Sequence, residues 1–165
     1  MNLENLKFVK NIDDPDRWAY ADWQQGSQQQ LHWANAKGDI TNADKADLGD
    51  LILLVQKFFP DSPETRVTHL VKVISTSAET LSDSEWGIVR EVEVLWVADF
   101  TNLANLPTDK DVFGWKRHRP QGTKIVKLEN LGDNRVIQLW HSIEIFQRHV
   151  TSMLGLTPKT NSSSI

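Results

Sequence analysis

Three stretches in the middle of the chain carry the clearest pattern of apolar and polar positions. Residues 66–75 and 86–100 alternate with a period of two and are rich in β-branched and aromatic side chains, which predicts two strands. Residues 50–59 (DLILLVQKFF) form a mostly apolar run between Gly49 and Pro60, which predicts a buried strand in the middle of a sheet. Because these strands follow one another with short connections, they favour an antiparallel or mixed sheet.

The segments on either side of these strands give weaker signals. Residues 17–23 (RWAYADW) are rich in aromatic side chains and predict a first strand or strand end, and the glutamine-rich residues 24–30 predict a loop. Asn42 is placed to cap a short helix over residues 43–48. Residues 124–128 predict one more short strand.

The last predicted element is a helix that starts after Asp133, its expected cap, and ends at Gly155. Its apolar residues recur at helical spacing and define one face: Val136, Leu139, Trp140, Ile143, Phe146, Val150, Met153 and Leu154. On its polar side, Glu144 and Arg148 are four residues apart, which predicts a surface ion pair. The spacing of His141 to these two residues matches no metal-binding motif, and we predict no metal site.

These elements predict an α+β fold: a mixed or antiparallel sheet, curled or closed into a small barrel, with a short helix and a C-terminal helix. Of the 165 residues, 39% are hydrophobic, which is enough for one core. We therefore expect a single domain over residues 1–155. Residues 156–165 are mostly small and polar and are expected to form a disordered tail.

Composition excludes several kinds of chemistry. The chain has no cysteine, which excludes disulfides, thiolate catalysis and zinc sites built on cysteine. It also has no Walker loop, no dinucleotide-binding glycine pattern and no GxSxG turn, so we expect no cofactor and no serine nucleophile. The N-terminus lacks the apolar region of a signal peptide, and the longest aliphatic run, residues 51–55, is too short to span a bilayer. These features predict a cytoplasmic protein with no membrane partner.

Charge is distributed unevenly along the chain. The formal net charge is −4, yet residues 112–127 carry five basic residues and no acidic one. The rest of the chain then has 13 basic residues against 22 acidic ones, or −9. A local basic segment on an acidic body predicts a restricted contact with a polyanion, and a solvated basic hairpin without a ligand is the alternative. The residues expected to meet a nucleic-acid backbone are Trp115, Lys116, Arg117, His118, Arg119 and Lys124.

The seven tryptophans suggest a second kind of contact. Trp96 and Trp140 fall within the patterns of a strand and a helix and are expected in the core, whereas Trp23 and Trp33 fall at strand ends or in loops. Aromatic faces stack on nucleobases, and neighbouring polar side chains can read the edges of a base. We therefore predict a base pocket formed by Tyr20, Trp23, His32, Trp33 and Asn35. The alternative is that the two tryptophans pack over the mouth of the barrel.

Four segments in this order resemble the PUA-like superfamily, and within it the EVE and YTH-like modules: WAYADW, DLGDLILL, VTHLVKVIS and WGIVREVEVLWV. The resemblance covers about residues 17–131, and its motifs are generic. It implies a curled mixed sheet with an aromatic pocket for a flipped or modified base beside a basic surface. In this resemblance Trp23 and Trp33 correspond to pocket walls and Asn35 to an edge reader. The chain departs from the EVE pattern in lacking its arginine- and asparagine-rich segment and in having the polar insert 24–30.

The sequence thus favours a module that binds RNA or DNA and catalyses no reaction. One alternative is a protein-interaction module in which the basic segment meets an acidic partner. Another is an enzyme that acts on a nucleotide or phosphorylated metabolite, with His69 or His118 as the acid or base. In the predicted strand, His69 lies on one face with Val67, Val71 and Val73.

Overall fold

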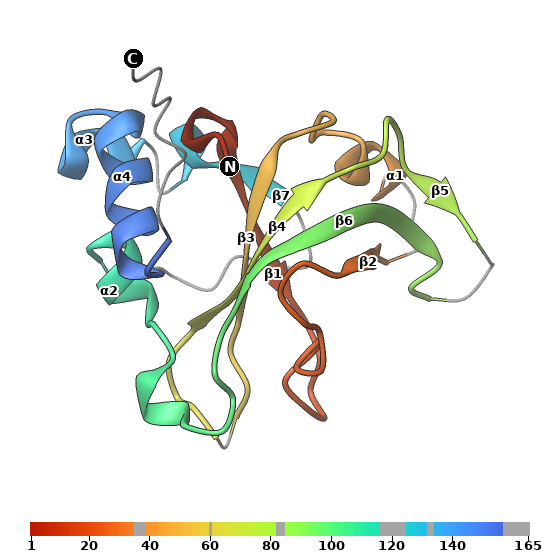
Figure 1. Ribbon diagram of the computed structural model, residues 1–165, viewed down its shortest axis with the longest axis horizontal. Coiled ribbons are helices and arrows are strands. Elements are labelled where there is room, and N and C mark those ends of the chain that lie inside the picture. Colours follow the sequence, from red (N-terminus) through yellow and green to blue (C-terminus); the bar gives the residue numbers. More distant parts are fainter. Residues whose placement is uncertain (35–38, 60, 82–84, 116–124, 132–133, 157–165) are drawn as a thin grey trace, which may run out of the picture.

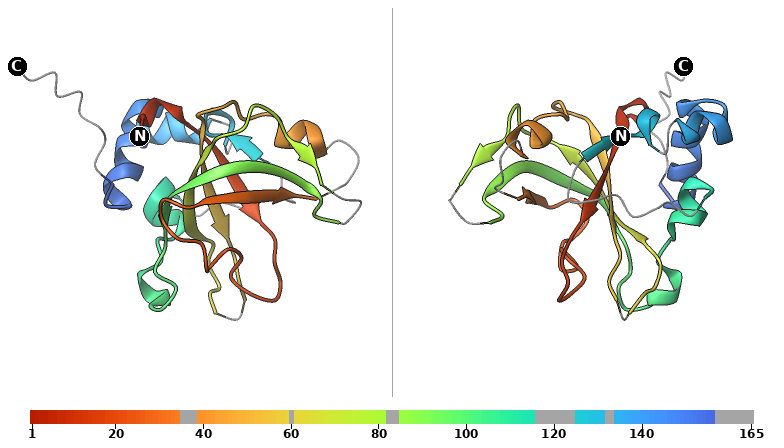
Figure 2. Two further views of the ribbon diagram at one scale, coloured as in Figure 1. Left: turned by 45° about the vertical axis from the view of Figure 1, so that its right-hand side comes forward. Right: turned by 180° about the vertical axis from the view of Figure 1, so that it is seen from behind.

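The computed structural model describes residues 1–34, 39–59, 61–81, 85–115, 125–131 and 134–156. It confirms the predicted α+β fold, with a curled mixed sheet and a C-terminal helix (Figures 1 and 2). The strands are β1 (Leu6–Ile12), β2 (Gln28–Trp33), β3 (Leu51–Gln56), β4 (Arg66–Val73), β5 (Glu79–Thr80), β6 (Ile88–Val97) and β7 (Ile125–Lys127). The α-helices are α1 (Asp39–Ala43), α2 (Asp109–Phe113), α3 (Arg135–Trp140) and α4 (Ile143–Met153), and short 3-10 helices span Leu3–Asn5, Leu103–Asn105 and Leu128–Asn130.

The strands form one sheet in the order β2-β6-β4-β3-β1-β7, and β5 adds to β6. β1 runs parallel to β3, while the other neighbours pair in antiparallel fashion. The sheet curls into a half-barrel (Figure 1). β3 lies inside the sheet with all six residues buried, as its apolar run predicts. β4, β6 and β7 also confirm the strands predicted at these positions.

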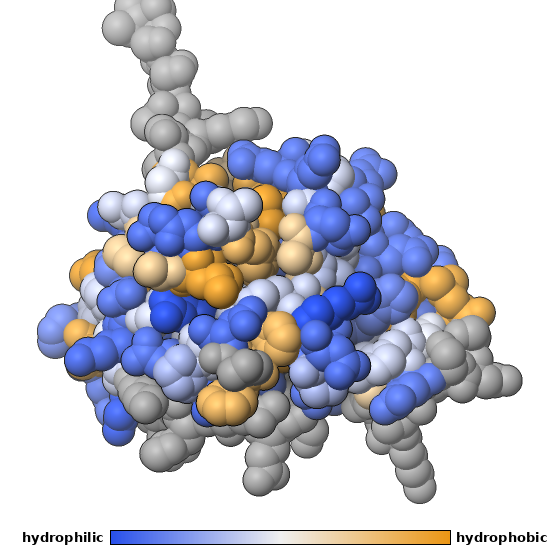
Figure 3. Space-filling model, turned by 90° about the horizontal axis from the view of Figure 1, so that it is seen from below, coloured by the Kyte–Doolittle hydropathy of each residue, from blue (hydrophilic) through white to orange (hydrophobic). Residues whose placement is uncertain are grey.

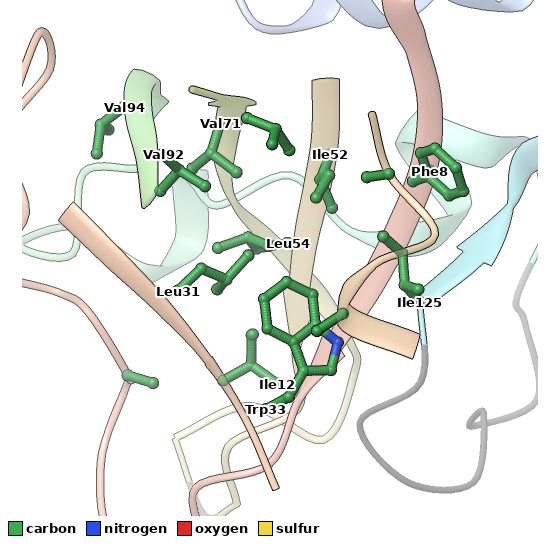
Figure 4. Close-up of a cluster of buried hydrophobic side chains, with 14 of the residues drawn as sticks. Phe8, Ile12, Leu31, Trp33, Ile52, Leu54, Val71, Val92, Val94 and Ile125 are labelled. Atoms are coloured by element: carbon green, nitrogen blue, oxygen red, sulfur yellow. The ribbon is translucent and has the colours of Figure 1, made fainter. Parts of the chain in front are cut away.

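The two faces of the sheet bury separate clusters of apolar side chains. On the concave face, Phe8, Leu31, Trp33, Ile52 and Ile125 pack together (Figure 4). Helices α2, α3 and α4 cover the opposite face, where their apolar side chains meet those of β1, β3 and β4. The helical cluster includes Val112, Phe113, Val136, Phe146 and Val150.

Strand β1 was not predicted, and the predicted first strand over residues 17–23 is wrong. β1 is buried on both faces, and its run is interrupted by Lys10 and Asn11, which are also buried. Its strand character comes from pairing with β3 and β7 and not from its local pattern. Residues 17–23 form turns instead, and Tyr20 has a left-handed backbone with φ of 59°, which a strand does not accommodate.

The glutamine-rich segment predicted as a loop contains the beginning of β2. Gln28 and Gln30 lie opposite Glu93 and Glu91 of β6, and the Gln30 amide donates to the Glu91 carboxylate at 2.9 Å. Cross-strand partners of this kind stabilise a strand whose own residues favour it weakly. Tertiary pairing therefore overrides the local composition here.

A bulge in β4 changes the side on which its side chains lie. Leu54 of β3 is opposite His69, whereas Val55 is opposite Val67, so Thr68 is the extra residue. As a result, Val67 packs in the helical cluster, whereas Val71 packs on the concave face. The prediction that Val67 shares a face with Val71 is therefore wrong. His69 meets Trp23 on the concave side and so lies with Val71 and Val73 as predicted.

The predicted C-terminal helix is divided into α3 and α4. His141 has a left-handed backbone with φ of 69°, and the Ser142 hydroxyl accepts from the Ile145 N–H at 3.1 Å to start α4. The Glu144–Arg148 ion pair is confirmed at 2.6 Å. The expected cap, Asp133, lies outside the described residues.

Gly155 follows α4 with φ of 68°, which confirms it as the residue that ends this helix. The Leu156 N–H donates to the Thr151 carbonyl, and its side chain packs against the helical cluster. The rest of the predicted tail, residues 157–165, lies outside the described residues. The predicted short helix is displaced, because Asn42 lies within α1 instead of capping a helix after it.

None of the helices in the described ranges combines the length and the apolar character that crossing a membrane requires.

Candidate functional site

An open cavity of about 580 Å³ lies where the half-barrel does not close. β2 is at one edge of the sheet and β1 is four places further along, yet both contribute to this cavity because the sheet curls. We call it the seam cavity. Its lining comes from β1, the loop after β1, β2 and the chain before β6: Lys10, Ile12, Asp13, Asp14, Pro15, Asp16, Arg17, Ala19, Tyr20, His32, Glu85 and Trp86.

Lys10 is the most buried charged group of the seam cavity, with 1% of its surface exposed. Its ammonium lies 4.9 Å from the centre of the Trp33 ring, a distance at which a cation interacts favourably with the face of an indole. Several carboxylates also line the cavity, those of Asp13, Asp14 and Glu85 among them. The lining of the cavity therefore combines one buried cation with several acidic side chains.

Tyr20 supplies a hydrogen-bond donor to the seam cavity. Its ring stacks on Trp23 with centroids 4.0 Å apart, and its hydroxyl accepts from the His32 backbone N–H at 3.3 Å. Burial raises the pKa of Tyr20 to about 12, so the phenol keeps its proton at neutral pH. Because the oxygen already accepts a hydrogen bond from the protein, its own hydrogen is available to a ligand.

His32 supplies an acceptor beside this donor. Its Nδ1 lies 2.8 Å from the Trp86 carbonyl oxygen, which can only accept a hydrogen bond. In the neutral imidazole, Nδ1 therefore carries the hydrogen and Nε2 has the free lone pair. The same contact fixes the backbone of Trp86, whose half-buried side chain forms another part of the cavity wall.

The structure separates the five residues predicted to form a base pocket. Tyr20 and His32 line the seam cavity, but Trp23 and Trp33 are buried in the concave core, with 8% and 1% of their surface exposed. They support the cavity from behind and are not its walls, because Tyr20 covers Trp23 and Lys10 covers the Trp33 ring. Asn35 lies outside the described residues.

Trp33 has one further feature. Its indole N–H is buried and has no hydrogen-bond partner among the described residues. Burying an indole in an apolar cluster is favourable, and here that gain outweighs one unsatisfied donor. Trp23 and Trp33 are therefore core residues and do not form walls of the seam cavity.

Other residues that line the seam cavity were not predicted from the sequence. The sequence does contain an indication for Lys10, because a lysine inside the apolar stretch FVKNI must find a polar environment. It contains no indication for Asp13 and Glu85, since acidic residues beside a strand are usually solvated. Trp86 was visible as a tryptophan just before a strand, but its place opposite β1 depends on the curl of the sheet.

The predicted backbone-contact residues Lys116, Arg117, His118, Arg119 and Lys124 lie outside the described residues. The two ends of this basic segment are described. Trp115 is half-buried on the helical side, with its ring 5.9 Å from Phe113 and 5.8 Å from the Arg135 guanidinium carbon. At the other end, Ile125 pairs with Lys10 of the seam cavity. The described ends of this segment thus lie on the helical side and beside the strand that carries Lys10.

His69, a predicted acid or base, is enclosed in the core and does not line the seam cavity. Its Nε2–H donates to the Tyr20 carbonyl at 2.9 Å, and its Nδ1 accepts from the Thr68 hydroxyl at 2.8 Å. Burial lowers the pKa of His69 to about 4, so the ring is neutral at physiological pH. These contacts give His69 a structural role, because they fix the turn that presents Tyr20 to the cavity.

The described residues contain no group of three or more histidine, aspartate or glutamate side chains placed to hold a metal ion. His149, near the predicted surface ion pair, stacks on Trp140 and bonds to the Asp111 carbonyl. The curled mixed sheet agrees in outline with the fold that a PUA-like resemblance implies, but membership of that superfamily stays a prediction. Searches of protein-family models, curated proteins and solved structures found no match to this chain.

Proposed function

We propose that the protein is a nucleic-acid-binding module that holds one unpaired base in the seam cavity and catalyses no reaction. The observation that carries this proposal is the chemistry of the cavity wall. The Tyr20 hydroxyl hydrogen and His32 Nε2 offer a donor and an acceptor on two residues that line the same cavity, together with Trp86 and Lys10. A volume of about 580 Å³ is within the range of small-molecule sites and suits a nucleoside.

Charge supports the entry of a base and not of a phosphate. The carboxylates of Asp13 and Glu85 would repel a phosphate inside the cavity, whereas they can accept hydrogen bonds from exocyclic amino groups of a base. The backbone of the nucleic acid would instead meet the basic residues between 116 and 127, since the chain enters β7 beside Lys10. We place this module in the cytoplasm, as the sequence predicts.

Replacing His32 with phenylalanine is expected to weaken nucleoside binding by about tenfold, because it removes the Nε2 acceptor while keeping an aromatic ring. The measurement is titration calorimetry of the four common nucleosides. His149→Phe is the matched control, since His149 lies on the helical side and does not line the cavity. A His32 variant that binds as tightly as the wild type, or equal losses in both variants, would remove the cavity from the proposed function.

A second experiment tests the basic segment with single-stranded oligonucleotides. Lys116→Glu combined with Arg117→Glu is expected to weaken oligonucleotide binding for all sequences and to reduce its salt dependence. It should leave nucleoside binding unchanged, because a nucleoside has no phosphate. Unchanged oligonucleotide affinity in this double variant would exclude the basic segment from the interface.

A protein-interaction module is the second candidate function. Four apolar side chains of the C-terminal helices are exposed by 40% or more: Ile137, Leu139, Ile145 and Met153. An exposed apolar surface of this kind would suit a protein partner, and the basic segment of the sequence would favour an acidic one. Copurification of a protein without any nucleic-acid absorbance would favour this candidate. An enzyme with His69 as acid or base is not supported, because the ring is enclosed.

A further inference from the structure

A second hollow of about 530 Å³ adjoins the seam cavity. We call it the Phe58 hollow, and its lining is Asp16, Arg17, Trp18, Tyr20, Ala21, Asp22 and Phe58. Three of these residues, Asp16, Arg17 and Tyr20, also line the seam cavity. The two hollows are therefore neighbours that share part of the loop after β1 as lining.

The aromatic floor of the Phe58 hollow is held in place from two sides. The Trp18 indole N–H donates to the Asp61 carboxylate at 3.1 Å, and its ring meets Phe58 edge-on with centroids 5.6 Å apart. The Ser62 N–H donates to the Phe58 carbonyl at 2.8 Å, which closes the turn that carries Phe58. Figure 1 shows both loops extending below the sheet, and Figure 3 shows hydrophobic surface among hydrophilic residues on that underside.

Arg17 belongs to the lining that the two hollows share. Its side chain is 81% exposed, and its one ion pair among the described residues, to Asp14 at 3.4 Å, is also solvent-accessible. An exposed pair of this kind contributes little to stability, so the guanidinium can turn to another anion at small cost. Guanidinium groups bind phosphate with two parallel hydrogen bonds.

We propose that the Phe58 hollow receives the base adjacent to the one in the seam cavity, while Arg17 binds the phosphate that joins them. This inference rests on the proposed function and specifies its ligand: single-stranded nucleic acid of at least two consecutive nucleotides. In this arrangement one base occupies the seam cavity, the joining phosphate meets Arg17, and the next base stacks on Phe58. This is the order base, phosphate and base along a nucleic-acid strand. Stacking on an aromatic side chain is tolerant of sequence, so the second position selects a base weakly.

Replacing Phe58 with leucine tests this arrangement. Leucine keeps apolar packing against Trp18 but removes the flat face, so a dinucleoside monophosphate should bind about tenfold more weakly, while a nucleoside binds as before. Phe59→Leu is the matched control, because Phe59 is adjacent and 73% exposed but does not line the hollow. Calorimetry with both ligands gives the affinities, and a thermal melt of each variant shows whether it is folded.

Arg17→Gln is a second variant, chosen because its exposed side chain has little effect on folding. It should weaken binding of the dinucleoside monophosphate and reduce its salt dependence, again without affecting the nucleoside. The inference is overturned if the wild type binds dinucleoside monophosphate no more tightly than nucleoside, or if Phe58→Leu and Phe59→Leu have equal effects. Failure of the wild type to bind any nucleoside would overturn the proposed function itself, and this inference with it.

Discussion

Replacing Arg90 with leucine is expected to lower the free energy of unfolding by about 3 kcal/mol or more. Arg90 lies on β6 with 1% of its surface exposed. Its Nη1 donates to the carbonyls of Ala43 and Ala46, each at 2.7 Å, and its Nη2 donates to the Ser75 carbonyl at 2.9 Å. Leucine would leave these three carbonyls without their donor, and each unsatisfied buried group costs roughly 1–3 kcal/mol.

The planar shape of the guanidinium explains why arginine occupies this position. Burial lowers the pKa of Arg90, but the carboxylates of Asp44, Asp47 and Asp50 oppose that effect, and arginine keeps its charge in proteins. Its fork bridges the end of α1 and the segment after β4, which otherwise share no strand pairing. Arg90→Lys should therefore give an intermediate loss, since a single ammonium cannot reach both sites.

Urea denaturation of the wild type and of each Arg90 variant measures these losses. Arg148→Leu is the matched control, because its side chain is 69% exposed and makes one ion pair with Glu144. That pair contributes about 0.3–0.5 kcal/mol. Similar losses at positions 90 and 148 would contradict the structural role of the Arg90 network.

The strands that the sequence predicts are those whose burial follows from their own residues. β3 is mostly apolar, β4 is rich in valine, and β6 alternates in a way that one buried face requires. β1 and β2 lack this property, because Lys10 and Asn11 interrupt the first and three glutamines begin the second. Their pairing partners lie 44 or more residues away in sequence, so no local pattern could reveal them.

The candidate site could be predicted only in part, because its residue types are visible in the sequence but their arrangement depends on long-range contacts. Tyr20 and His32 were identified by their type and by their neighbours, and both line the seam cavity. Trp23 and Trp33 have the same composition around them, yet the curl of the sheet places them in the core. Whether an aromatic side chain near a strand end faces ligand or core depends on the closure of the barrel. Closure depends on contacts between β1, β2 and the loop after β1, which single-sequence patterns do not encode.

Lowering the pH from about 6.5 to about 4 is expected to remove about 3 kcal/mol of stability through His69 alone. The folded-state pKa of His69 is about 4 because of burial, whereas the unfolded chain should have the ordinary value of 6.5. Above pH 6.5 the ring is neutral in both states, so it makes no contribution that depends on pH. Between the two values the unfolded chain binds a proton that the folded chain does not, which favours unfolding as the pH falls.

His69→Gln tests this coupling, because glutamine can still donate to the Tyr20 carbonyl but does not titrate. The variant should be less stable near pH 7, owing to altered packing, yet its free energy of unfolding should fall less steeply than that of the wild type between pH 6.5 and 4. Parallel slopes in urea denaturation across this range would contradict a neutral His69 in the folded state. A proton NMR titration gives an independent reading, since the His69 ring signals should not shift until the pH approaches 4. Because this ring fixes the turn that presents Tyr20, nucleoside binding should weaken over the same pH range as the fold does.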